Sequence, residues 1–292
     1  MTKQVTTQQL EPFTIDPVTR IGQVTLAVSN LERATTYYQQ VIGLTPLNQD
    51  AHSAELGSNG KPLIRLEARP GGKRYPRATG LFHLALLLPT RQDLGHWLKH
   101  YVASQQRMID GAGDHLVSEA LYLSDLEGNG LELYQDRPRD TWEYDGERVK
   151  MATLAVDLPA LAAEAPDHPW SKLPPETTLG HIHLQVNDVA KAVWFYHQVL
   201  GFGAMAEYPG AGFLGAGGYH HHIGVNVWHS AGAEPPPPGS LGLVNFEIRL
   251  PTKNVRDTLL ARLDKLDYPF EWSDNILLVQ DPSGNRVLLT VK

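Results

Sequence analysis

Apolar and polar residues alternate along several short runs of this chain, and such a period of two predicts β-strands. The run "VTLAV" at 24–28 is one of them. Polar residues, Asn30 and Asp188, each follow such a strand and precede apolar residues at helical spacing, so both are expected to be helix N-caps. Gly43 and Gly201 are expected to end these helices, because a residue without a Cβ adopts the left-handed conformation easily. Short strands with glycine-rich turns follow, so the unit reads strand, helix, three strands.

This unit recurs along the chain. Residues 21–44 ("IGQVTLAVSNLERATTYYQQVIGL") align with 179–202 ("LGHIHLQVNDVAKAVWFYHQVLGF"), and 80–90 ("GLFHLALLLPT") align with 242–252 ("GLVNFEIRLPT"). Such internal similarity is typical of repeated structural units. We therefore predict an α+β protein of four βαβββ modules. Its N-terminal half spans 15–136, with modules one at 20–70 and two at 78–136; a linker spans 137–176; the C-terminal half spans 177–292, with modules three at 177–232 and four at 240–292.

Composition narrows the classes of function. The 292 residues are 42% hydrophobic and carry a net charge of −7 without a basic block, which argues against a nucleic-acid partner. The N-terminus lacks the apolar segment of a secretory signal, and no apolar run is long enough to span a membrane, so we expect a soluble, cytoplasmic protein with no membrane partner. The chain has no cysteine and 13 histidines. Any metal must therefore be held by His, Asp, Glu or backbone oxygen.

The stretch "GDHLVSEALYLSDLEGNGLELYQD" at 113–136 carries the most chemical information. Gly128, Asn129 and Gly130 form a turn signal, and Glu132 then stands inside an apolar strand. A glutamate in a strand most often faces water at a sheet edge, and a histidine on an apolar strand is most often a satisfied core residue. Here these bland interpretations compete with a functional one, because His115 and Tyr122 precede Glu132 in the same stretch.

The repeated unit and this stretch together resemble the vicinal oxygen chelate superfamily, which includes glyoxalase I, fosfomycin-resistance proteins and type I extradiol dioxygenases. The extradiol signature places a His, a Tyr, an Asp-Pro-x-Gly turn and a metal-binding Glu in this order. His115, Tyr122, the turn 125–128 and Glu132 match it, with Leu126 in place of the usual proline at a turn position. The resemblance covers nearly the whole chain and is strongest to the catechol-2,3-dioxygenases of bacilli. It implies a two-domain fold in which modules pair into open β-barrels.

The resemblance also implies a metal site. In the family, the first strand of each of two paired modules supplies a His, and the last strand of one supplies a Glu. The first-strand positions of modules one to four hold Gln23, His83, His181 and Asn245, and the last-strand positions of modules two and four hold Glu132 and Leu288. Only modules two and three then hold a full ligand set, His83, His181 and Glu132, for Fe(II) or alternatively Mn(II). His183 shares strand parity with His181, and only the repeat register favours the latter.

This ligand set predicts which modules lie together. Module two should pair with module three, and module one with module four. The usual dioxygenase arrangement instead places the site between modules three and four.

Catalytic and substrate-binding residues follow from the same resemblance. His115 and Tyr122 are expected to hydrogen-bond the bound substrate, and a His of the third module is expected to act as the base. In "GGYHHHIGVNVW" at 217–228, His222 matches best, with His221 and Asn226 expected to contact substrate. Strand alternation puts His220 and His222 on one face and His221 on the other, and which of the three faces the site stays open.

The implied function is an extradiol dioxygenase that opens a catechol-type ring with dioxygen, so its partners are a small aromatic diol and O₂. Two alternatives remain: another metalloenzyme of the superfamily, such as a glyoxalase-type isomerase or a thiol transferase, or a non-catalytic small-molecule-binding resistance protein. The ligand set argues against the last. Exposed sheet edges are compatible with a homodimer.

Overall fold

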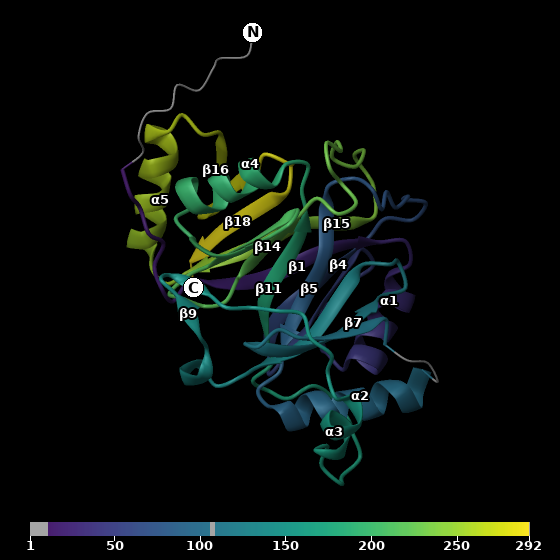
Figure 1. Cartoon of the computed structure of the whole chain (residues 1–292). Helices are drawn as coiled ribbons and strands as arrows, with labels where there is room; N and C mark the ends of the chain where they lie inside the picture. The colour runs from purple at the N-terminus through teal and green to yellow at the C-terminus, as the bar shows by residue number, and fades with distance from the viewer. Residues whose placement is uncertain (1–10, 106–108, 292) are drawn as a thin grey trace.

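Two curled eight-stranded sheets form the centre of the molecule (Figure 1). The structure is a computed structural model that describes residues 11–105 and 109–291. The first sheet joins modules one and four in the order β16-β17-β18-β15-β1-β4-β3-β2. Its strands are β1 (Arg20–Val28), β2 (Thr45–Gln49), β3 (Ser53–Ser58), β4 (Lys61–Ala68), β15 (Gly242–Leu250), β16 (Phe270–Ser273), β17 (Ile276–Gln280) and β18 (Arg286–Val291).

The second sheet joins modules two and three in the order β12-β13-β14-β11-β5-β8-β7-β6. Its strands are β5 (Gly80–Leu87), β6 (Gly111–Asp114), β7 (Ser118–Ser124), β8 (Gly130–Asp136), β11 (Thr178–Gln185), β12 (Gly203–Tyr208), β13 (Ala211–Gly215) and β14 (Ile223–Asn226). Antiparallel pairing of β5 with β11, and of β1 with β15, links the sequence halves. The predicted α+β fold and the predicted pairing of module two with three, and of one with four, are confirmed.

Each module carries one helical segment between its first and second strands. These are α1 (Leu31–Tyr37) with the π-helical turn η1 (Tyr38–Ile42), α2 (Arg91–Gln105), α4 (Val189–Val193) with the π-helical turn η3 (Trp194–Val199), and α5 (Lys253–Lys265). Asn30 accepts a hydrogen bond from the Arg33 amide and Asp188 accepts one from the Lys191 amide, as expected of N-caps. Gly43 and Gly201 follow these segments with φ of 94° and 85°, the left-handed conformation predicted for them.

The segment between the halves lies against the second sheet. It contains η2 (Arg139–Thr141), the hairpin of β9 (Tyr144–Asp145) and β10 (Arg148–Val149), and α3 (Leu158–Ala163). Trp142 and Val149 pack on Val117 of the β6–β7 turn and on Met205 of β12. Leu154 exchanges backbone hydrogen bonds with Asp114. Residues just before Leu154 are thereby held over the end of β6.

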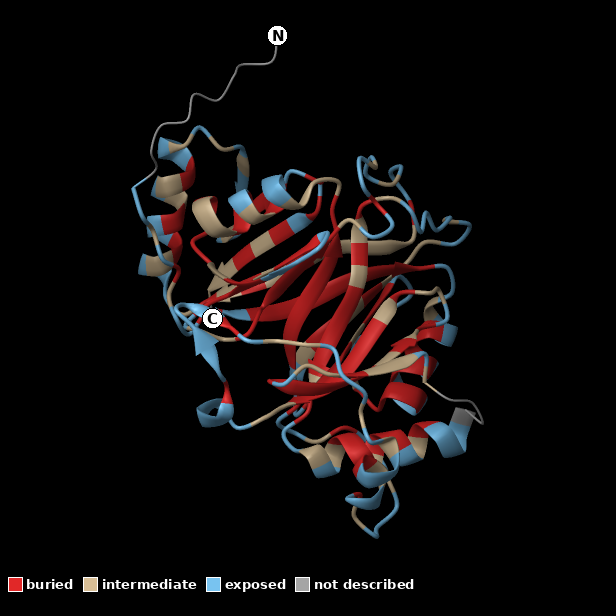
Figure 2. Cartoon of the chain, in the orientation of Figure 1, coloured by how far each residue is buried: buried red, intermediate tan, exposed pale blue. Residues whose placement is uncertain are grey.

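The apolar core is continuous across both sheets. Buried residues follow the central strands, while the helices carry exposed residues along one side (Figure 2). Leu26 of β1 and Ile182 of β11 are both fully buried. Among the described residues, no helix is both long and apolar enough to cross a membrane.

Candidate metal centre

Three neighbouring strands of the second sheet carry His83, Glu132 and His181. Their order is β11, β5, β8. In the register of these strands, Ala85 of β5 stands beside His181 on one side and beside Glu132 on the other. The short Ala85 side chain leaves room above it, so the longer side chains of Glu132 and His181 can meet there. His83, two residues before Ala85, points to the same face and completes the group.

The three ligand atoms face one another at short range. His83 Nε2 lies 3.0 Å from Glu132 Oε2, His181 Nε2 lies 3.2 Å from the same oxygen, and the two Nε2 atoms are 3.3 Å apart. Adjacent ligands of a six-coordinate ion with bonds of about 2.1 Å stand about 3 Å apart. The three atoms are thus spaced like one face of such a coordination shell, and the residues fit a divalent metal. No other group of three potential ligands lies this close within residues 11–105 and 109–291.

The environment keeps His181 and Glu132 in metal-binding form. Burial lowers the pKa of His181 to about 4, so the imidazole is neutral near pH 7. Burial alone would raise the pKa of Glu132, but attraction and hydrogen bonding from His181 and His83 hold it well below its usual value. Neutral imidazoles and a carboxylate are the forms that bind metal.

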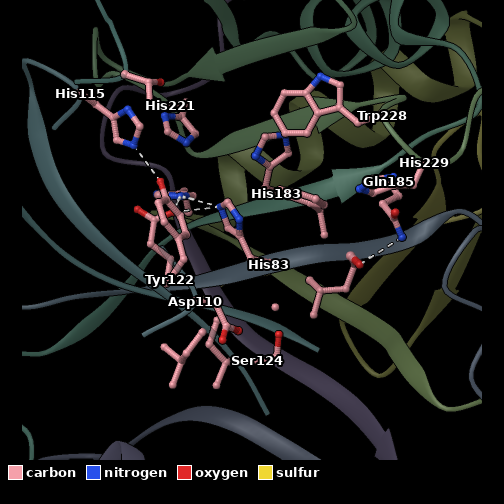
Figure 3. A pocket seen from close by; sticks show the side chains of 18 of the residues that line it. His83, Asp110, His115, Tyr122, Ser124, His183, Gln185, His221, Trp228 and His229 are labelled. Carbon is pink, nitrogen blue, oxygen red and sulfur yellow. Dashed lines mark hydrogen bonds and ion pairs between the residues drawn. The ribbon is translucent and has the colours of Figure 1, made fainter. Parts of the chain in front are cut away.

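The group opens into a cavity of about 660 Å³ (Figure 3). His115 and Tyr122 line the same cavity. His115 Nδ1 donates to the Ala152 carbonyl oxygen at 2.8 Å, which leaves Nε2 to accept the Tyr122 hydroxyl at 2.7 Å. Burial, followed by the nearby charge of Glu132, raises the pKa of Tyr122 well above its usual value, so Tyr122 stays protonated.

An aromatic wall bounds the rest of the cavity. Phe82 lies with its ring centroid 5.1 Å from that of His183 and 5.2 Å from that of Trp228, and Phe213 lies 5.5 Å from His183. These residues were not singled out as pocket residues from the sequence, although His183 and Gln185 could have been, because both share the strand parity of His181 and both line the cavity. Trp228 follows the end of β14, where strand parity gives no signal.

The structure corrects the position expected of His222. His221 lines the metal cavity, with its ring centroid 4.1 Å from that of His181. His222 instead lines a separate cavity of about 400 Å³, and its Nδ1 accepts the Ala216 amide at 3.1 Å. The expectation failed because residues 216–222 are not strand: Gly217 and Gly218 have positive φ, and β14 begins only at Ile223. Strand alternation therefore does not apply to the three histidines.

Asn226 is also placed differently from the expectation. It is fully buried on β14, and its Oδ1 accepts the Trp228 amide at 3.1 Å. It is not among the residues that line the metal cavity, whereas its register partner Gln185 is. Its position therefore supports the turn that presents Trp228, and does not support a substrate contact.

Comparison with known proteins places this geometry in a family. Residues 20–133 and 178–289 match the model of the Glyoxalase/Bleomycin resistance protein/Dioxygenase superfamily. The chain is 43% identical over 279 residues to the catechol-2,3-dioxygenase of Bacillus subtilis (strain 168). The alignment covers 94% of this chain and 97% of that protein.

Solved structures share the fold at low sequence identity. Glyoxalase I from Zea mays aligns with 16% identity and a TM-score of 0.56, covering 93% of this chain and 92% of its own. The cppA protein from Streptococcus pneumoniae TIGR4 aligns with 11% identity and a TM-score of 0.57, covering 94% of this chain and 100% of its own. With four βαβββ modules, a cavity that holds two histidines and a glutamate, and these matches over most of its length, the chain belongs to the glyoxalase, bleomycin resistance protein and dioxygenase superfamily.

Proposed function

We propose that this protein is a metal-dependent extradiol dioxygenase, which opens the ring of a catechol-type substrate with dioxygen. One observation carries the proposal: His83, His181 and Glu132 are grouped so that they could hold a metal ion, and they line an aromatic-walled cavity together with His115, Tyr122 and His221. The name of the Bacillus subtilis relative supports the same activity.

The ligand group suits Fe(II). Two histidines and one carboxylate on one face leave the remaining coordination positions open, which is the arrangement of non-haem Fe(II) oxygenases. Bound Fe(II) would supply the redox chemistry that brings the diol and dioxygen together. Mn(II) accepts the same ligands, and we propose it as the alternative ion.

The cavity walls orient a flat ring. Phe82, Trp228 and Phe213 offer apolar faces and edges against which an aromatic ring packs favourably. His115, Tyr122 and His221 line the cavity together with the three potential ligands, so the two hydroxyls of a diol would point there. Tyr122, held in place by His115, is positioned to hydrogen-bond a substrate oxygen.

His221 is the proposed base in place of His222. It lines the cavity and contacts His181, so its ring stands next to the metal-binding group. Burial, followed by the neighbouring His181 and His220, holds the pKa of His221 well below its usual value. A neutral imidazole there can accept a proton from a substrate hydroxyl and return it later in the reaction.

The test is anaerobic loading with Fe(II), followed by exposure to a panel of catechols in air. A yellow ring-fission product with matching oxygen uptake supports the proposal, and Glu132→Ala, which lacks one ligand, should give neither. Wild-type protein that holds one equivalent of iron but consumes no oxygen with any catechol would reject it.

A further inference from the structure

A chain of hydrogen bonds runs from His221 through His220 to Asp136, and of these three residues only His221 lines the metal cavity. His221 Nδ1 lies 2.7 Å from His220 Nδ1, and His220 Nε2 lies 2.9 Å from Asp136 Oδ1. His220 is 0% exposed and is enclosed by the rings of Tyr219 and Trp142. The His221–His220 hydrogen bond therefore lies in the protein interior, and only Asp136 at the end of the chain is partly exposed.

Asp136 also receives hydrogen bonds from a second direction. The Tyr219 hydroxyl donates to Asp136 Oδ2 at 2.9 Å, so the Tyr134 hydroxyl, 2.8 Å from that of Tyr219, is the donor in the Tyr134–Tyr219 pair. Gly180 makes room for Tyr134, because a Cβ at this position would lie 1.7 Å from the Tyr134 hydroxyl oxygen. Asp136 thus accepts hydrogen bonds from Tyr219 and His220, and Tyr134 and His221 are linked to it through these two residues.

The donor directions in this network determine a tautomer. A carboxylate only accepts hydrogen bonds, so His220 carries a proton on Nε2. In the neutral form of His220, Nδ1 carries a lone pair, and His221 donates to it from its own Nδ1. The other nitrogen of His221, Nε2, is left without a proton and belongs to a ring that lines the cavity.

The geometry points to Asp136 and His220 as positioning residues, which hold His221 as the Nδ1-protonated tautomer and leave the Nε2 lone pair for the cavity. His221 needs such support because it lies in the irregular turn before β14, outside the strand ladder. Strand β8 carries both Glu132 of the metal-binding group and Asp136 of this network, which are four residues apart on the same strand face. The tautomer is a property of the chain itself, and only its use for a base rests on the proposed function.

The first measurement needs no metal and no substrate. Long-range ¹H–¹⁵N correlation spectra of metal-free, ¹⁵N-histidine-labelled protein distinguish the two tautomers, and His221→Asn identifies the His221 signals by their loss. Wild-type protein should show the Nδ1–H form of His221. His220→Asn should retain it, because the Asn Oδ1 replaces the accepting Nδ1, whereas His220→Phe and Asp136→Ala should give a mixture or the Nε2–H form.

Two controls distinguish a specific change of the His221 tautomer from a general change in the fold. His222→Asn changes the neighbouring buried histidine, which is outside the network, and should leave the His221 signals unchanged. Asp136→Ala removes a side chain at the partly exposed end of the chain, so it carries the test if His220→Phe does not fold. An Nε2–H tautomer in wild-type protein, or an unchanged Nδ1–H tautomer in both His220→Phe and Asp136→Ala, would overturn the inference.

Oxygen uptake with catechol then tests the positioning role. With equal iron content, kcat of His220→Phe should fall about 100-fold with KM little changed, and His220→Asn should recover most of it. An altered tautomer without a fall in kcat would overturn the positioning role. If wild-type protein itself shows no turnover, the proposed function fails, and the spectra alone decide the tautomer.

Discussion

Asparagine substitutions at the adjacent residues His221 and His222 should have different effects: the first should lower turnover, and the second should change how the stability of the protein depends on pH. His221→Asn should lower turnover about 100-fold, because it removes the proposed base from the cavity. His222→Asn should keep turnover, because His222 lines the other cavity and an Asn Oδ1 can still accept the Ala216 amide. The stability effect of His222→Asn should instead depend on pH, and its size can be worked out from the burial of the ring.

His222 is 2% exposed. Burial, followed by the positive charge of Arg20 and the neighbouring His220, His181 and Arg139, holds its pKa well below the usual 6.5. As pH falls below 6.5, the unfolded chain takes up a proton at this position and the folded chain does not. The free energy of unfolding therefore falls with decreasing pH, by about 1.4 kcal/mol per pH unit while the folded ring stays neutral. Between pH 6.5 and 5 this amounts to about 2 kcal/mol, which the asparagine variant does not lose.

Urea unfolding at pH 7.5 and pH 5.0 measures this difference. At pH 7.5 we expect His222→Asn to be less stable than wild type by about 1–2 kcal/mol, because the variant loses the packed ring. At pH 5.0 that gap should close or reverse, since other buried histidines such as His183 contribute equally to both proteins. An equal gap at both pH values would refute the argument, and so would a loss of turnover in His222→Asn with full turnover in His221→Asn.

Three further predictions address the metal group and its support. Glu132→Gln should abolish the thermal stabilisation that Mn(II) gives wild-type protein, about 2.7 kcal/mol at 100 times the dissociation constant; calorimetry that finds an equal rise in the variant would contradict the ligand assignment. Ala85→Leu should fill the space over which Glu132 and His181 meet, costing about 1–3 kcal/mol of stability and weakening Mn(II) binding, and titration calorimetry that finds unchanged affinity would count against that packing. Gly180→Ala should lower the melting temperature measured by calorimetry, because its Cβ would collide with the Tyr134 hydroxyl, and an unchanged melting temperature would show that the strand yields there.

Much of the fold could be predicted from repeats because strand register is strict, and the family resemblance then pointed to His83, His181 and Glu132 as potential ligands. A shift of one residue turns every side chain of a strand to the other face, so aligned repeats place equivalent side chains on equivalent faces. His83 and His181 occupy such equivalent positions on β5 and β11, and the structure brings their Nε2 atoms to 3.3 Å. The cross-pairing of modules followed from the family resemblance, since only modules two and three hold the full ligand set that the resemblance implies.

The second layer of the site could not be predicted in the same way. His220, His221 and His222 lie in a turn, where the direction of each side chain depends on backbone angles that no alternation sets. Phe82 and His83 are adjacent in sequence, yet both line the cavity. The pairing of β5 with β11 has a register shift beside His183, the register partner of His83, and such an irregularity can turn neighbouring side chains toward one cavity.

The two sheets show how little of the chemistry depends on the fold. Both are built from two βαβββ modules in the same strand order, and β1 pairs with β15 as β11 pairs with β5. In the first sheet, however, the ligand positions hold Gln23, Asn245 and Leu288, and the nearby Glu247 is paired with Arg249 and with the Gln23 amide. One strand framework thus carries a possible metal site in one sheet and, near the equivalent positions of the other, residues in polar and ionic pairing. The difference lies in three side chains, which is why function in this superfamily has to be argued from the site and not from the architecture.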